Sequence, residues 1–202
     1  MSGIRLVTRA DDAGMHTVAN HAIRDTATEG IVRNISLMAP TPAIRNAWEL
    51  LGDLGDRTDF GLHVTLTAEW YTLRWRPLVT GDRAKSFVRP DGTMHYTVDD
   101  LIDASPDLDA LMEEVSAQHE LLSNLGFELR YLDTHMGVDR VPGLAERIAE
   151  FCAQKKLVNN REAFDSATIA RLPDWPGPAE HPGTELADHL AQVPAGTYLL
   201  VG

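Results

Sequence analysis

The chain has 202 residues, of which 44% are hydrophobic and 24% charged, and it carries a formal net charge of -12 at pH 7. These values are typical of a soluble globular domain with a large core, so residues 1–202 are expected to form a single domain. The acidic charge is spread along the chain, which argues against binding to nucleic acid or to an anionic membrane surface. Cys152 is the single cysteine and gives no disulfide framework, and no run approaches the ~18 apolar residues of a membrane helix, so a cytoplasmic protein is expected.

Apolar runs and helical patterns alternate along the chain. In order, strands are expected at 4–9, 32–38, 59–66, 128–133, 157–159 and 196–202. The helices are expected at 16–29, from Pro40 through Leu51, at 107–125, from Pro142 to Lys155 and at 184–192. Gly30 and Gly126 are expected to close two of these helices as C-cap residues. The segment 68–98 is long, aromatic and rich in turn residues, and 161–195 is ambiguous apart from its one helical stretch.

This alternation predicts an α/β fold whose strands pair in parallel through right-handed crossovers. In such folds, functional sites form at the carboxyl ends of the strands. Asp11 and Asp12 follow the first strand, His63 lies late in the third, and His135 follows the fourth. A barrel or a curved sheet would bring these strand ends to one mouth.

The adjacent carboxylates of Asp11 and Asp12 are the most informative feature of the chain. Aspartate is poor in strands and neighbouring like charges repel, so a strand that ends in this pair is not built for stability. Such a turn can hold one carboxylate on a metal and leave the other free to move a proton. Together with His63 and His135, Asp12 would supply one carboxylate and two imidazoles, the ligand set of a hydrolytic metal centre.

Each candidate residue also has a simpler interpretation. Two aspartates at a strand end could cap a helix, a lone histidine in a strand is usually a hydrogen-bonded core residue, and His16 is expected at the surface of the first helical turn. The aromatic residues Trp70, Tyr71 and Trp75 could stack on a sugar ring or form the core of a lid. Asp133 could orient a metal ligand from outside the coordination sphere.

Three motifs follow one another along the chain: Ala10-Asp11-Asp12-Ala13-Gly14, Gly61-Leu62-His63-Val64-Thr65-Leu66-Thr67 and Asp133-Thr134-His135. At these residues the chain resembles the YdjC-type carbohydrate deacetylases, over roughly residues 4–158, although Ala13 stands where that family has phenylalanine. The resemblance implies an incomplete or distorted (β/α) barrel with mostly parallel strands. It implies removal of acetyl groups from N-acetylated sugars such as chitooligosaccharides, with one divalent metal ion, zinc or magnesium. It also implies Asp12, His63 and His135 as metal ligands and Asp11 as the catalytic base.

Other functions stay open at this point. One is a different metal-dependent amide or ester hydrolase, and another is a non-catalytic protein that binds a metal or a sugar. Asp11 counts against the second, because binding alone gives no reason to keep an unbound carboxylate beside a ligand. A small acetylated sugar is the expected partner, and a homo-oligomer is left open.

In the resembling family, a strand like 196–202 leads into a His-Pro-Gly segment whose histidine could protonate the leaving amine. Here His181-Pro182-Gly183 precedes the helical stretch at 184–192, so that role is not transferred to His181. The full protein is expected to continue beyond Gly202.

Overall fold

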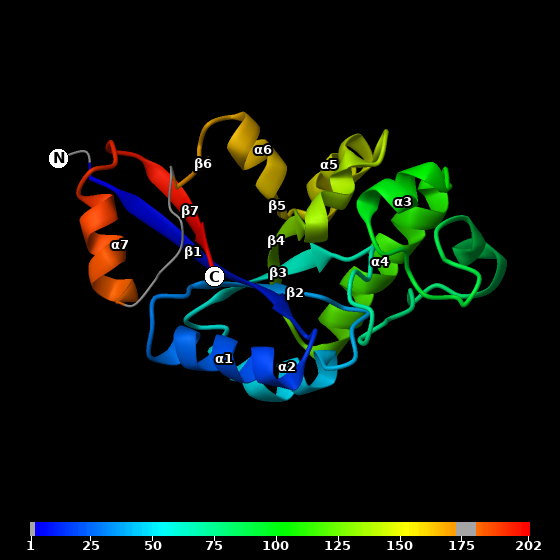
Figure 1. Ribbon diagram of the computed structural model, residues 1–202, viewed down its shortest axis with the longest axis horizontal. Coiled ribbons are helices and arrows are strands. Elements are labelled where there is room, and N and C mark those ends of the chain that lie inside the picture. Colours follow the sequence, from blue (N-terminus) through cyan, green and yellow to red (C-terminus); the bar gives the residue numbers. More distant parts are fainter. Residues whose placement is uncertain (1–2, 173–180) are drawn as a thin grey trace.

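The computed structural model describes residues 3–172 and 181–202 (Figure 1). The described residues form a sheet of seven parallel strands in the spatial order β5-β4-β3-β2-β1-β7-β6. The strands are β1 Arg5–Ala13, β2 Asn34–Leu37, β3 Asp59–Val64, β4 Leu129–Thr134, β5 Val158–Asn159, β6 Ala170–Arg171 and β7 Thr197–Val201. The sheet curls into half of a barrel with helices around it, which confirms the expected incomplete (β/α) barrel with parallel strands.

Helices flank this sheet. They are α1 Thr17–Thr28, α2 Ile44–Leu51, α3 Val98–Asp103, α4 Leu108–Leu125, α5 Leu144–Lys155, α6 Asn160–Asp165 and α7 Pro182–Leu190. Short 3₁₀ segments are found at Gly52–Leu54, Gly81–Ser86 and His135–Arg140, the last of which is interrupted by the non-helical Met136 and Gly137. In the view of Figure 1, α1 and α2 run below the strands, whereas α5 and α6 lie above β4 and β5. None of the described helices combines the length and apolar character needed to cross a membrane.

The strands β2 and β3 form the buried centre of the sheet. Every residue of each strand after the first is buried. Continuous burial of this kind is typical of parallel strands that are covered on both faces. Gly61 in β3 leaves room for a neighbouring aromatic ring, since a Cβ atom there would lie 2.2 Å from the ring of Tyr131 on β4. A larger residue at position 61 would therefore require the ring of Tyr131 to move.

The first strand is longer than expected, because it continues through both aspartates. Between Ala10 and Ala13 its register against β2 shifts, so that Asp11 and Asp12 stand opposite the single residue Ser36. This is a β-bulge, in which Asp12 takes a left-handed conformation with φ at 63°. A regular strand would direct two adjacent side chains to opposite faces, whereas a bulge re-aims them. The expectation that the strand ends before the two aspartates was wrong for this reason.

The first helix also differs slightly from the prediction. The exposed His16 caps its N-terminus, and Glu29 caps its C-terminus. Gly30 follows the helix without a left-handed backbone and is instead required for space. A Cβ atom at Gly30 would lie 2.7 Å from the carbonyl oxygen of Thr26. The surface position predicted for His16 is thus confirmed, and the C-cap role predicted for Gly30 was wrong.

The longest helix, α4, agrees closely with the predicted range 107–125. Asp107 accepts hydrogen bonds at its N-terminus, and Gly126 ends it with φ at 111°, where a residue without Cβ is favoured. The short α3 just before it was not predicted, although Thr97 and Asp100 form a capping box there. The ambiguous stretch 161–195 contains most of α6 and all of β6 and α7.

Candidate metal centre

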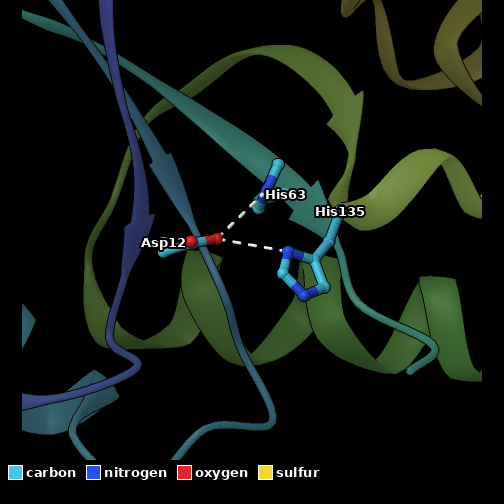
Figure 2. A group of neighbouring side chains, drawn as sticks. All are labelled: Asp12, His63 and His135. Carbon is cyan, nitrogen blue, oxygen red and sulfur yellow. Dashed lines mark ion pairs between the residues drawn. The ribbon is translucent and has the colours of Figure 1, made fainter. Parts of the chain in front are cut away.

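Asp12, His63 and His135 come together at the carboxyl ends of β1, β3 and β4, as expected. Figure 2 shows the carboxylate of Asp12 facing both imidazole rings. Its Oδ1 atom lies 3.4 Å from Nε2 of His63 and 3.2 Å from Nδ1 of His135, and the three ligand atoms all lie within 4.8 Å of one another. Ligands that are each about 2 Å from one tetrahedral zinc ion stand roughly 3.3 Å apart. The two distances from Asp12 Oδ1 to the imidazole nitrogens are close to that value.

Each histidine has a carboxylate close to it on the side away from Asp12. Nδ1 of His63 lies 3.0 Å from Oδ2 of Asp133, and Nε2 of His135 lies 3.0 Å from Oε2 of Glu69. Both imidazoles and the side chain of Asp133 are almost wholly buried. A carboxylate behind an imidazole sets the ring orientation and the tautomer that offers its lone pair to a metal. The arrangement therefore presents one nitrogen of each ring toward Asp12.

The electrostatics of the cluster reflect an excess of carboxylates. Burial alone would raise the pKa of Asp12, but the imidazoles of His135 and His63 hold it well below its ordinary value. Burial likewise opposes the charged form of His63, yet Asp133 and Asp12 raise the pKa of His63 to about 10. The neighbouring carboxylates thus favour the protonated form of the imidazole when no cation is bound. Because metal ligands must give up their protons, a divalent cation and these protons are alternative ways to neutralise the cluster.

The donor set fits a divalent metal. Oδ1 of Asp12 is buried and accepts no hydrogen bond from the described residues, since neither imidazole contact has hydrogen-bond geometry. A buried carboxylate oxygen without a donor is costly unless a cation pairs with it. Asp11, His63 and Asp133 form a second close group, in which both oxygens of Asp133 also lack a hydrogen-bond donor among the described residues. There, however, a cation is already present, since Nη2 of Arg9 lies 3.0 Å from Oδ2 of Asp133. The group around Asp12 is therefore the better candidate metal site.

Arg9 holds Asp11 beside this cluster. Its Nε and Nη2 atoms donate to the two carboxylate oxygens of Asp11 at 2.5 and 2.9 Å, and its Nη1 atom donates to Oδ1 of Asn160 at 3.2 Å. Burial opposes the charge on Arg9, but Asp133 and Asp11 raise its pKa above the ordinary value, so the guanidinium stays charged. Each oxygen of Asp11 keeps a second lone pair, and 22% of its side chain is exposed. Asp11 is thus fixed in place and still able to accept a proton.

Buried amides hold the chain on either side of the cluster. Gln118 of α4 accepts a hydrogen bond from the backbone nitrogen of Thr65 at 3.0 Å and donates to the carbonyl of the same residue at 2.7 Å. Thr65 follows His63 by two residues, so α4 fixes the end of β3. In the same way, Asn20 of α1 accepts a hydrogen bond from the backbone nitrogen of Gly14 at 2.7 Å, directly after the bulge in β1.

The aromatic residues of the segment after β3 separate into two kinds. Trp75 is buried and packs in a small cluster with Met38 and Met94. Trp70 and Tyr71 are 51% and 84% exposed. Trp75 therefore belongs to the core of this segment, and only the other two residues are free to meet a ligand.

The sequence did not reveal all the residues that surround the cluster. Asp133 lies beside the candidate ligand His63, its partner in the register between β3 and β4, and its role in orienting that ligand stays a prediction. Arg9 was missed, although it precedes Asp11 by two residues in the same strand, the spacing that places side chains on one face. Glu69 was also missed, because it lies in an irregular segment that carries no periodic signal.

The chain is similar to a known protein family and to carbohydrate deacetylases from two bacteria. The YdjC-like protein family matches the chain over residues 5–197. The carbohydrate deacetylase of Vibrio cholerae is 31% identical over 147 residues, which cover 73% of this chain and 54% of that protein. Carbohydrate deacetylase 1 of Listeria innocua is 26% identical over 136 residues, which cover 67% and 53%. The chain thus spans about half the length of these curated relatives.

A solved structure supports the fold assignment. It is the crystal structure of a "putative cellobiose-phosphate cleavage protein" from Enterococcus faecalis, which matches with a TM-score of 0.78 over 98% of this chain and 80% of that chain. The two sequences are 15% identical, so the likeness shows a shared fold alone.

Proposed function

Since this chain belongs to the YdjC-like protein family, we propose that it is a metal-dependent hydrolase that removes acetyl groups from N-acetylated sugars such as chitooligosaccharides. The observation that carries the proposal is the convergence of Asp12, His63 and His135 beside Asp11. The names of the curated relatives, which are carbohydrate deacetylases, support the same reaction class. The proposal treats the chain as one deacetylase-like domain.

In this proposal, Asp12, His63 and His135 hold one divalent cation, zinc or magnesium. Bound in such a site, a divalent cation lowers the pKa of water and polarises a carbonyl oxygen. Asp133 and Glu69 keep the two imidazoles oriented and offset their charge. The protein thereby supplies a rigid set of ligands in which the positions of the donor atoms are set by three strands.

Asp11 is the proposed catalytic base. Hydrolysis of an acetamide forms a C–O bond between water and the acetyl carbon and breaks the C–N bond, which leaves acetate and the free amine of the sugar. Asp11 accepts a proton from the attacking water, and the departing amine takes up a proton as the C–N bond breaks. Arg9 keeps the carboxylate in position for this transfer. A positioned base contributes about 10²–10⁴-fold to the rate.

Acetate release from N,N'-diacetylchitobiose tests the proposal. The metal-loaded protein should release acetate, a chelator should abolish the release, and added metal should restore it. Hydrolysis of other amides or esters with no acetate from the sugar would instead indicate a different hydrolase. Metal binding without any turnover would indicate a binding protein. Full metal retention in both His63→Ala and His135→Ala would rule out the ligand assignment.

A further inference from the structure

A cavity of about 630 Å³ borders Asp11 at the carboxyl ends of the strands. Its walls come from the ends of β4, β5, β6 and β7 and from α6. Because all these strands are parallel, the cavity lies at the same edge of the sheet as the candidate metal centre. Its volume falls within the range of about 300–1,000 Å³ typical of ligand sites.

One wall of this cavity is apolar and another offers hydrogen-bond donors. Leu132, Ile148 and Phe164 contribute the apolar part. Asn160 contributes an amide whose Oδ1 atom already accepts a hydrogen bond from Arg9, whereas its Nδ2 atom donates to none of the residues that the structure describes. The cavity therefore has an apolar surface and, next to Arg9, a hydrogen-bond donor.

Arg171 of β6 is the second donor. Its guanidinium lies 5.6 Å from the centre of the ring of Phe164, and no carboxylate pairs with it among residues 3–172 and 181–202. In contrast, Arg161 at the same cavity is engaged with Asp139 at 2.8 Å. Arg171 thus offers several N–H groups that have no anionic partner in the described part of the chain.

We propose that this cavity binds the sugar rings of the substrate, and that Asn160 and Arg171 donate hydrogen bonds to its hydroxyl or amide carbonyl oxygens. A pyranose ring carries apolar C–H faces and a rim of hydroxyl groups, which match the two kinds of wall. The inference rests on the proposed function, since Asp11 links the cavity to the deacetylase chemistry.

The proposal also places the sugar on one particular side of the metal centre. The exposed Trp70 and Tyr71 follow Glu69, which contacts His135, and neither of them lines this cavity. A sugar bound over these aromatic rings would depend on Trp70 and not on the two donors of the cavity. The two modes of binding therefore predict different effects of mutation.

The test uses the metal-loaded protein and two measurements. Calorimetric titration with chitobiose, the deacetylated product, gives Kd without turnover, and acetate release from N,N'-diacetylchitobiose gives KM and kcat. Asn160→Ala and Arg171→Ala should each raise Kd and KM about fivefold, the effect of one lost hydrogen bond. Arg171→Ala should leave kcat almost unchanged, whereas Asn160→Ala also removes a contact of Arg9 and is therefore judged on Kd. The matched controls Asn124→Ala and Arg83→Ala, which alter exposed residues outside the cavity, should change neither constant.

The outcomes distinguish this inference from the proposed function. If wild type releases acetate but the two cavity variants keep wild-type Kd and KM, or if Trp70→Ala alone weakens binding, the cavity assignment is wrong and the proposed function stands. If wild type releases no acetate yet binds chitobiose through Asn160 and Arg171, the cavity is a sugar site and the proposed function fails. Absence of any sugar binding overturns the cavity assignment. Arg171→Gln replaces Arg171→Ala if the latter lowers the Tm.

Discussion

Gln118 is the side chain through which α4 holds the end of β3, and replacing it with methionine tests that role. Its carboxamide accepts a hydrogen bond from Thr65 and donates one to Thr65 and another, at 2.9 Å, to Oε1 of Glu114. Methionine has a similar length but leaves three buried polar groups without these partners. Each such group costs about 1–3 kcal/mol, so the free energy of unfolding should fall by roughly 3–9 kcal/mol in Gln118→Met.

Urea unfolding of the metal-free protein, followed by tryptophan fluorescence, measures this loss. Gln154→Met, at an exposed position of α5, is the matched control and should change the free energy of unfolding by less than about 0.5 kcal/mol. The comparison requires equal m-values in the variants and wild type. A loss below about 1 kcal/mol in Gln118→Met would refute the reasoning, because Thr65 would then have found other partners or water.

Three further predictions concern ionisable groups. Asp11→Asn should leave the metal bound while turnover falls at least ~10²-fold, whereas Asp12→Asn should weaken metal binding itself. Metal analysis and acetate assays of both variants check this, and the opposite pattern would reverse the two roles. Asp133→Asn removes the carboxylate behind His63 and should lower metal affinity about 10–100-fold in a chelator competition, whereas unchanged affinity would show that Asp133 does not orient the ring. Burial favours the protonated carboxyl of Glu114 in the folded state and so raises its pKa above the ordinary 4.5. The contribution of this carboxyl to the free energy of unfolding is therefore fully present below pH 4.5 and is lost as the pH rises through the folded-state pKa. The unfolding free energy of wild type minus that of Glu114→Gln should therefore fall with pH, by at most about 1.4 kcal/mol per pH unit, and a rise would contradict the assignment.

Short-range signals explain what could be predicted about this protein from its sequence. The helix α4 was predicted almost to the residue, because Asp107 and Gly126 act on the backbone within one turn of its ends. The meeting of Asp12, His63 and His135 was also predicted, since each lies at the end of a strand and parallel strands bring these ends together. That these residues bind a metal remains a prediction.

By itself, then, the sequence determined the order of the main strands and helices, the parallel α/β class and the three residues of the candidate metal centre. Only the tertiary structure decided how they are held. The bulge at Asp11 and Asp12 depends on the register with β2, and the bond from Arg9 to Asn160 joins residues 151 positions apart. The contact of Glu69 with His135 likewise depends on how an irregular segment returns to the sheet. Propensities and caps act between residues that are close along the chain, whereas these contacts depend on which distant segments pack together, and no local pattern encodes that choice.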